Sequence, residues 1–350
     1  MERILKSIVK YGSRALLLAL PGALLLPAAY ADPCTLQAQM TPAQRQQYEQ
    51  AARTLIGEVQ SGDFTGLRND TLAAVAADFG GIERSAQALQ PLIQQAGITV
   101  EDLIAFEAGG QGQGAQFFCT PTGSTMTIVL NFPSLPQGHY ALAIVYATGV
   151  EKPQQISLIL AQGPQGQWQL AGFFAKPLML AGQDGVWYWK QARQYAQSHN
   201  QWAAWFYYQI AGNLVEPVNF LSSPNLDKLH DEAQKVQPSN LPGQQPTTFN
   251  ANGESFQITR VDTSTELGPL DFVIHYTPDA QEAAELRDPT QARHQVVNLM
   301  AGILAVHPGL RHAFHGLWVY ADSNGATLFA LELPMDQIPG GPAGGNAAGE

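Results

Sequence analysis

The sequence predicts an α+β protein with a cone-like curved antiparallel sheet, N-terminal helices, a helical hairpin connector and a C-terminal ββαββ domain. Apolar residues recur at three- and four-residue spacing between residues 42 and 96, which is typical of amphipathic helices. Between residues 103 and 174 the apolar spacing changes to two, and glycine and proline separate the short segments. Helices followed by hairpins predict helices packed on one face of a sheet.

Residues 1–31 have the layout of a secretory signal peptide. Arg3, Lys6, Lys10 and Arg14 precede an apolar run at 15–26, and Ala29-Tyr30-Ala31 forms a small-residue cleavage site. The apolar run is interrupted by Pro-Gly and is shorter than the roughly 20 residues of a membrane-spanning helix. We therefore expect cleavage, export to the periplasm or the cell exterior, and no membrane span in the mature chain.

The charge balance argues against nucleic-acid and membrane-surface partners. Removing residues 1–31 leaves 14 basic against 28 acidic residues, a formal charge of −14 with histidine neutral. Such a surface repels phosphate backbones and anionic lipids, but it can favour cations or basic partners. The length of the chain allows two domains.

The chain has only two cysteines, Cys34 and Cys119. In an exported protein such a pair predicts one disulfide bond, with a pair of free thiols as the alternative. Neither cysteine belongs to a C-x-x-C pair, so we do not expect a redox enzyme.

Helices are predicted at 42–60, 65–77 and 82–96. Thr41-Pro42 supplies an N-cap and a proline in the first turn, and Ser61-Gly62-Asp63 ends the first helix. Short strands are expected afterwards at 103–108, 115–119, 126–132, 140–148, 155–161 and 168–174.

The region 42–176 resembles the nuclear transport factor two-like (cystatin-like cone) superfamily. The resemblance depends on the first helix running into Ser61-Gly62-Asp63-Phe64 and on the closing strand WQLAGFF at 168–174. It implies a cone with an open mouth that serves as an active site or as a surface for binding or dimerisation. Enzymes of that superfamily commonly place an Asp–His pair in the cone. No such pair is found here, because His139 is the only histidine of the region and lies beside a glycine turn. An enzyme would require His139 to meet a carboxylate from another segment, such as Glu107 or Asp102.

The connector at 177–236 contains a helical hairpin, with helices expected at 186–198 and 201–214. Spacing close to that of a tetratricopeptide repeat is found at Tyr188, Ala192, Tyr195, Ala204, Tyr208, Ala211 and Pro217, so the hairpin at 186–217 resembles a single repeat. One repeat cannot bury its own apolar face, so we expect it to pack against a neighbouring domain. The hairpin is rich in aromatic side chains, which can pack between domains or bind a peptide or sugar. Four tryptophans are candidate binding residues, as is His139 in the preceding region: Trp187, Trp189, Trp202 and Trp205.

Residues 237–246 (QPSNLPGQQP) are predicted to be a linker, because they are polar and rich in proline and glycine. The following region, 247–338, is predicted to fold as ββαββ. Its last two strands are joined through Asn324-Gly325, a strong turn pair. A Gly/Ala tail at 339–350 has nothing to bury and is expected to be disordered.

Other chemical patterns are weak. His307, His312 and His315 could bind a transition metal, but their spacing matches no zinc motif and a solvated turn explains them equally well, so we expect no metal or cofactor. The glycine-rich segment at 109–114 precedes a strand instead of a helix, which favours a hairpin loop over a phosphate-binding loop. His230-Asp231-Glu232 is interpreted as an exposed charged face, and His275 as a satisfied histidine of a strand.

No catalytic motif is found. We therefore expect an exported, non-catalytic binding or protein-interaction module, with a protein or a small apolar molecule as its partner. The alternative is a hydrolase or isomerase that acts on a small apolar molecule in the cone. A structural protein of the cell envelope is a third hypothesis.

Overall fold

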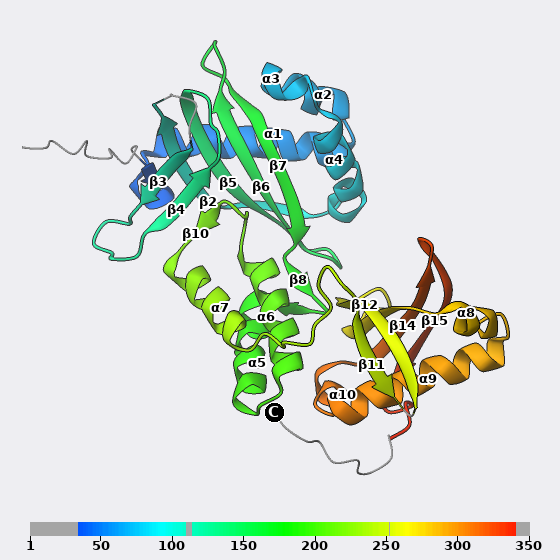
Figure 1. Ribbon diagram of the computed structural model, residues 1–350. Helices are drawn as coiled ribbons and strands as arrows, with labels where there is room; N and C mark the ends of the chain where they lie inside the picture. The colour runs from blue at the N-terminus through cyan, green and yellow to red at the C-terminus, as the bar shows by residue number, and fades with distance from the viewer. Residues whose placement is uncertain (1–33, 110–113, 252, 341–350) are drawn as a thin grey trace, which may run out of the picture. The chain divides into compact units, whose positions relative to one another are not determined.

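The computed structural model describes residues 34–109, 114–251 and 253–340, and it has the predicted α+β class (Figure 1). The expected signal peptide, the glycine-rich positions 110–113 and the residues 341–350 of the predicted tail lie outside this part of the chain. None of the helices in the described residues combines the length and the apolar character needed to cross a membrane.

The first of the predicted N-terminal helices, at 42–60, is confirmed to within one residue. Helix α1 spans Pro42–Ser61, and the hydroxyl of its N-cap Thr41 accepts a hydrogen bond from Gln44 N. Gly62 ends the helix in the left-handed conformation, with a φ of 75° that glycine adopts without a steric penalty. Helix α4, Gly80–Ile93, replaces the expected helix at 82–96.

The prediction of a single helix at 65–77 is wrong. This stretch forms α2 (Phe64–Asn69) and α3 (Ala73–Ala76), which are separate short helices. Between them the backbone pairs with a strand, because Leu72 N donates to Leu170 O and Leu170 N donates to Asp70 O, each at 2.8 Å. This contact between distant segments separates the two helices, although Thr71 N still donates to Arg68 O at 3.2 Å.

The main N-terminal sheet is antiparallel and has the strand order β1-β2-β5-β6-β7. Two of the six predicted strands lie outside it, since β3 and β4 pair with β10 in a separate small sheet. The bounds of these strands are β1 Cys34–Leu36, β2 Gly97–Ala108, β3 Ala115–Cys119, β4 Ile128–Phe132, β5 Gly138–Thr148, β6 Gln154–Gln162, β7 Trp168–Pro177 and β10 Leu221–Ser222.

Both faces of the main sheet are covered. Side chains of α1 and α4, such as Leu55 and Ile93, form one core with alternate residues of β2, β5 and β6. On the other face the aromatic rings of Phe106, Phe117 and Phe132 pack together, with centroids 4.7–6.1 Å apart. Together with Val218, Leu221 and Leu226 of the connector, these side chains fill the space on this second face.

The predicted disulfide bond is confirmed. Cys34 in β1 is bonded to Cys119 in β3, with Cα atoms 5.2 Å apart. The bond connects an edge strand of the main sheet to the small sheet and spans 85 positions of the sequence.

The helical hairpin consists of α5 (Gly185–Gln197) and α6 (Gln201–Val215), within one residue of the prediction at each end. Short strands β8 (Met179–Leu180) and β9 (Gln183–Asp184) precede it, and α7 (Pro224–Lys235) follows. Each helix starts at a side-chain cap, from Asp184, Asn200 and Ser223 respectively.

The C-terminal region contains one strand more than the predicted ββαββ order. The additional strand β11 (Thr247–Ala251) directly follows the linker and is too short and polar to be recognised by its alternation. The sheet order is β11-β12-β13-β14-β15, and β13 and β14 are parallel while the other neighbours are antiparallel. The remaining elements are β12 Glu254–Ser264, β13 Asp271–Thr277, α8 Ala280–Glu285, α9 Pro289–Val306, α10 Leu310–Ala313, β14 Gly316–Ser323 and β15 Ala326–Pro334.

The helical hairpin and the C-terminal sheet share one hydrophobic core. Trp202 and Phe206 of α6 contact Phe272 of β13, with ring centroids 6.0 and 5.0 Å apart. Buried residues of α9, including Leu299 and Met300, belong to the same core. The hairpin thus buries its apolar face against a neighbouring sheet, as expected. The predicted linker at 237–246 contains no helix or strand.

Candidate functional site

The four candidate tryptophans of the hairpin are used mainly for internal packing. Trp202 is only 8% exposed, and its ring stacks on that of His307 with centroids 4.4 Å apart. Trp187, Trp189 and Trp205 are partly buried against the same core. They do not form a continuous exposed aromatic surface for a partner.

Trp189 belongs to a polar network that connects the helices of the connector. Its indole N–H donates to Glu232 Oε2 at 2.7 Å, and Arg193 donates to both oxygens of the same carboxylate at 2.7 and 2.9 Å. The hydroxyl of Tyr208 donates to Glu232 Oε2 at 3.3 Å. The interpretation of residues 230–232 as an exposed charged face is therefore wrong for Glu232, because its carboxylate binds α5 and α6.

His139 does not form the interior acid–base pair that an enzyme in the cone requires. It lies opposite Glu107 on neighbouring strands, and Nδ1 is 3.7 Å from Glu107 Oε2. Both side chains are more than half exposed. Asp102 is partly buried on β2, and burial raises its pKa above the ordinary value, with the charge of Glu101 adding to the effect.

A different surface brings polar groups together. We call it the outer face, the side of β12–β15 that alternates with the core residues Phe272, Ile274, Leu317 and Val319. Successive residues of a strand point to opposite faces of a sheet, so the outer face carries Val273 and His275 of β13 and Trp318 and Tyr320 of β14. The residues at neighbouring positions on β12 and β15 include Arg260 and Glu332.

Aromatic rings on the outer face stack in a row. Trp318 and Tyr320 are nearly parallel, with centroids 5.5 Å apart, and Tyr320 stacks on His275 at 4.6 Å. Because the rings cover each other's faces, the row presents edges and polar tips to its surroundings.

His275 is held by hydrogen bonds at both ring nitrogens. Nε2 is 2.6 Å from Arg260 Nη2, and Nδ1 is 2.6 Å from Asp322 Oδ2. A guanidinium can only donate, so Nε2 accepts and Nδ1 carries the proton that is donated to Asp322. Burial would raise the pKa of Asp322, but hydrogen bonds from Thr327 and His275 and the charge of Arg260 bring it below the ordinary value.

A groove of about 710 Å³ lies beside this His275 network. We call it the outer-face groove. Its charged residues are three acids, Asp262, Glu266 and Asp322, and one base, Arg260, whereas hydroxyl groups and the ring of Tyr320 complete much of the wall. The hydroxyl groups belong to Thr259, Thr263, Ser264 and Thr327.

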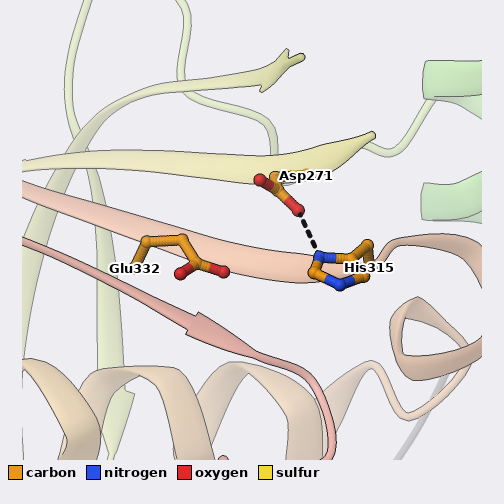
Figure 2. A group of neighbouring side chains, drawn as sticks. All are labelled: Asp271, His315 and Glu332. Atoms are coloured by element: carbon orange, nitrogen blue, oxygen red, sulfur yellow. Dashed lines mark hydrogen bonds and ion pairs between the residues drawn. The ribbon is translucent and has the colours of Figure 1, made fainter. Parts of the chain in front are cut away.

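At the other end of the outer face lies a group of three possible metal ligands (Figure 2), which we call the Asp271 cluster. Asp271 at the start of β13, His315 just before β14 and Glu332 of β15 place their donor atoms within 4.8 Å of one another. Asp271 is fully buried, and the side chain of His315 is 54% exposed. Burial raises the pKa of Glu332, and the charge of Asp271 raises it further, while His315 acts in the opposite direction.

The three histidines considered from the sequence do not come together. Burial lowers the pKa of His307 to about 4 while its ring stacks on Trp202. His312 is exposed on α10, and its carbonyl accepts a hydrogen bond from Tyr195. Only His315 joins a cluster of metal-ligating side chains in the described residues.

Sequence reasoning missed the outer face as a site, although a signal was present. Side chains that can form hydrogen bonds share one face of two otherwise apolar strands. They are Asp271 and His275, with Val273 between them, and then Trp318, Tyr320 and Asp322. The pairing of these strands was not readable, because β13 and β14 are parallel neighbours separated by three helices.

Comparison of the chain with models of known protein families, with curated proteins and with solved structures found no match. The resemblance of residues 42–176 to the nuclear transport factor two-like superfamily stays a prediction.

Proposed function

We propose that this protein is an exported, non-catalytic binding module and that its binding site is the outer-face groove. The ligand class that fits best is a small polar molecule with a cationic amine. The observation that carries this proposal is the excess of carboxylates in the groove, with Asp262, Glu266 and Asp322 against the single Arg260.

The size and the chemistry of the groove support a small ligand. Small-molecule sites commonly have volumes of roughly 300–1,000 Å³, and a groove of about 710 Å³ falls in this range. Carboxylates that line a concave surface concentrate the local negative potential and attract cations. The hydroxyl groups of Thr263 and Ser264 offer further hydrogen bonds that would orient such a ligand.

The arrangement around His275 supports binding over catalysis. A histidine that acts as a general base needs a free nitrogen within reach of the substrate. Asp322 orients the ring in the way that a catalytic carboxylate does, but Arg260 donates to Nε2 and occupies the basic nitrogen. The network gives the groove a rigid wall with a fixed tautomer.

Export is supported by the disulfide bond between Cys34 and Cys119, because such bonds form and persist in oxidising compartments. The alternative hydrolase or isomerase in the N-terminal cone has less support. Aromatic side chains fill one face of the sheet, and helices cover the other.

The proposal is tested by isothermal titration calorimetry on the mature chain, residues 32–350. The probes are spermidine and L-arginine, with glucose as a neutral comparison and citrate as an anionic one. We expect the amines to bind and the other two probes to give no heat. The double variant Asp262→Asn/Glu266→Gln should bind the amines at least tenfold more weakly, since it removes two of the three carboxylates.

The matched control is Asp231→Asn, which neutralises an exposed acid on α7 away from the groove. It should bind the amines as the wild type does. If amine binding weakens equally in Asp231→Asn and in the groove variant, the amines are attracted only by the overall negative charge, and the proposal is overturned. Failure of both amines to bind the wild-type chain would also overturn it.

A further inference from the structure

The Asp271 cluster is a second site on the same face, and it does not depend on the groove. Its three side chains come from β13, from the residue before β14 and from β15. In Figure 2 the carboxylates of Asp271 and Glu332 and the ring of His315 point toward one region. The strand pairing of the sheet thus places one nitrogen donor and two carboxylates together.

The separation of the donor atoms matches that of ligands on one metal ion. Zinc binds histidine nitrogen and carboxylate oxygen at about 2.0–2.2 Å, so two ligands of a tetrahedral zinc lie about 3.3–3.5 Å apart. The distance from His315 Nδ1 to Asp271 Oδ1 is 3.3 Å. The whole group of donor atoms lies within 4.8 Å, and the flexible side chain of Glu332 can close the remaining gap by rotation.

The surroundings orient the first of these ligands. Asp271 is fully buried, and its second oxygen accepts a hydrogen bond from the indole N–H of Trp318 at 3.1 Å. This leaves Oδ1 directed at His315. Hydrogen bonds of this kind from outside the ligand set hold metal-binding carboxylates in place.

Within the described residues, one carboxylate oxygen of Glu332 lacks an interaction that would offset its burial. This atom, Oε1, is buried and has no hydrogen-bond partner among the residues that the structure describes. A buried acceptor without a partner is destabilising unless something else satisfies it. Gly316 permits this close approach, because a Cβ atom at that position would lie 2.3 Å from Glu332 Oε1 and 2.9 Å from Asp271 Oδ1.

We propose that Asp271, His315 and Glu332 bind a divalent transition-metal ion, with Zn²⁺ as the best match. An imidazole nitrogen with carboxylates suits zinc, whereas Ca²⁺ and Mg²⁺ prefer oxygen ligands alone. Three protein ligands leave a fourth position, and the exposed side chain of His315 opens it to solvent. The competing interpretation is an ion pair between Asp271 and a protonated His315 that needs no metal.

The test is calorimetric titration of Zn²⁺ into the mature chain after treatment with a chelator and removal of that chelator. We expect one site per chain, and neither Ca²⁺ nor Mg²⁺ at millimolar concentration should displace Zn²⁺ from it. Titration with Co²⁺ should give the intense visible absorption of a four-coordinate complex. His315→Ala and Glu332→Gln should each weaken Zn²⁺ binding at least tenfold.

The matched control is His312→Ala, which removes an exposed histidine three positions before His315 and outside the cluster. It should retain the affinity of the wild type for Zn²⁺. Circular dichroism of each variant establishes that the chain is folded, and Glu332→Gln tests the site without removing the histidine.

Two outcomes would overturn the proposal. One is that the wild-type chain binds no Zn²⁺, which would leave only the ion pair. The other is that His312→Ala loses as much affinity as His315→Ala, which would indicate adventitious binding to surface histidines. Neither outcome bears on the groove, because the amine titrations use variants of Asp262 and Glu266.

Discussion

The indole N–H of Trp318 donates a hydrogen bond to Oδ2 of the fully buried Asp271 at 3.1 Å. The same indole ring stacks on Tyr320, which lines the outer-face groove. A single side chain therefore connects the two polar sites of the C-terminal sheet. It donates to the carboxylate of one site and stacks on a ring that lines the other.

We predict that Trp318→Phe lowers both stability and metal affinity. The substitution keeps an aromatic ring for stacking but removes the hydrogen bond to a buried carboxylate, which should lower the free energy of unfolding by about 1–3 kcal/mol. The affinity for Zn²⁺ should fall about 10–100-fold, as expected when a group that orients a metal ligand is lost. Urea unfolding and Zn²⁺ calorimetry measure the two effects.

Trp205→Phe is the control for the loss of ring volume, because Trp205 is partly buried in the core shared by the hairpin and the sheet. It should leave the affinity for Zn²⁺ unchanged. If both tryptophan variants weaken Zn²⁺ binding to the same extent, Trp318 does not act through Asp271.

The second prediction concerns Glu232, whose carboxylate receives hydrogen bonds from Arg193, Trp189 and Tyr208. Replacing it by glutamine keeps the shape but removes the charge and turns one acceptor into a donor that faces other donors. Glu232→Gln should lower the free energy of unfolding by about 1.5–3 kcal/mol. Asp231→Asn, one residue earlier and exposed, should change it by less than about 0.5 kcal/mol. Equal effects in urea unfolding would show that the network contributes nothing beyond a surface charge.

Much of the secondary structure was predictable, because its signals are local. The hairpin helices α5 and α6 have caps at Asp184 and Asn200 and continuous apolar periodicity, so their bounds were predicted within one residue. The errors occur where contacts between segments distant in the sequence determine the secondary structure. The backbone at 70–72 leaves the helical pattern because it pairs with Leu170, and β11 is defined by its pairing with β12.

The candidate sites were not predictable for the same reason. His315 was considered as a metal ligand, but it was grouped with its sequence neighbours His307 and His312 instead of with Asp271, 44 positions earlier. The parallel pairing of β13 with β14 brings Asp271 and His315 together, and only the folded chain shows it. Conversely, the tryptophans of the hairpin were predicted as candidate binding residues, but they mainly form core contacts.

The third prediction is that the disulfide contributes strongly to stability. The bond between Cys34 and Cys119 spans 85 positions, and on the loop-entropy model a loop of this size stabilises the folded state by about 4.5 kcal/mol. The double variant Cys34→Ser/Cys119→Ser should lose about this amount in urea unfolding. Reduced wild-type protein should unfold at the same urea concentration as the variant. A reduced wild type that keeps the midpoint of the oxidised protein would contradict the prediction.

The last prediction uses His307, at the C-terminal end of α9, where burial lowers the pKa to about 4. In the unfolded chain the pKa of histidine is about 6.5, so between these values the unfolded state binds more protons than the folded state. The stability contributed by the neutral ring is therefore fully present above pH 6.5 and is lost as the pH falls toward 4. The loss should reach about 2–3 kcal/mol in the free energy of unfolding.

His307→Phe keeps a ring to stack on Trp202 but cannot be protonated. We expect its advantage over the wild type to grow by about 2–3 kcal/mol between pH 7 and pH 4 and to stay constant between pH 7 and pH 8. The control His294→Phe replaces an exposed histidine of the same helix and should show no such growth. Urea unfolding at five pH values measures the difference. A difference between His307→Phe and the wild type that stays constant down to pH 4 would mean that the pKa of His307 is the same in the folded and unfolded states, and that its contact with Trp202 leaves the ring accessible to solvent.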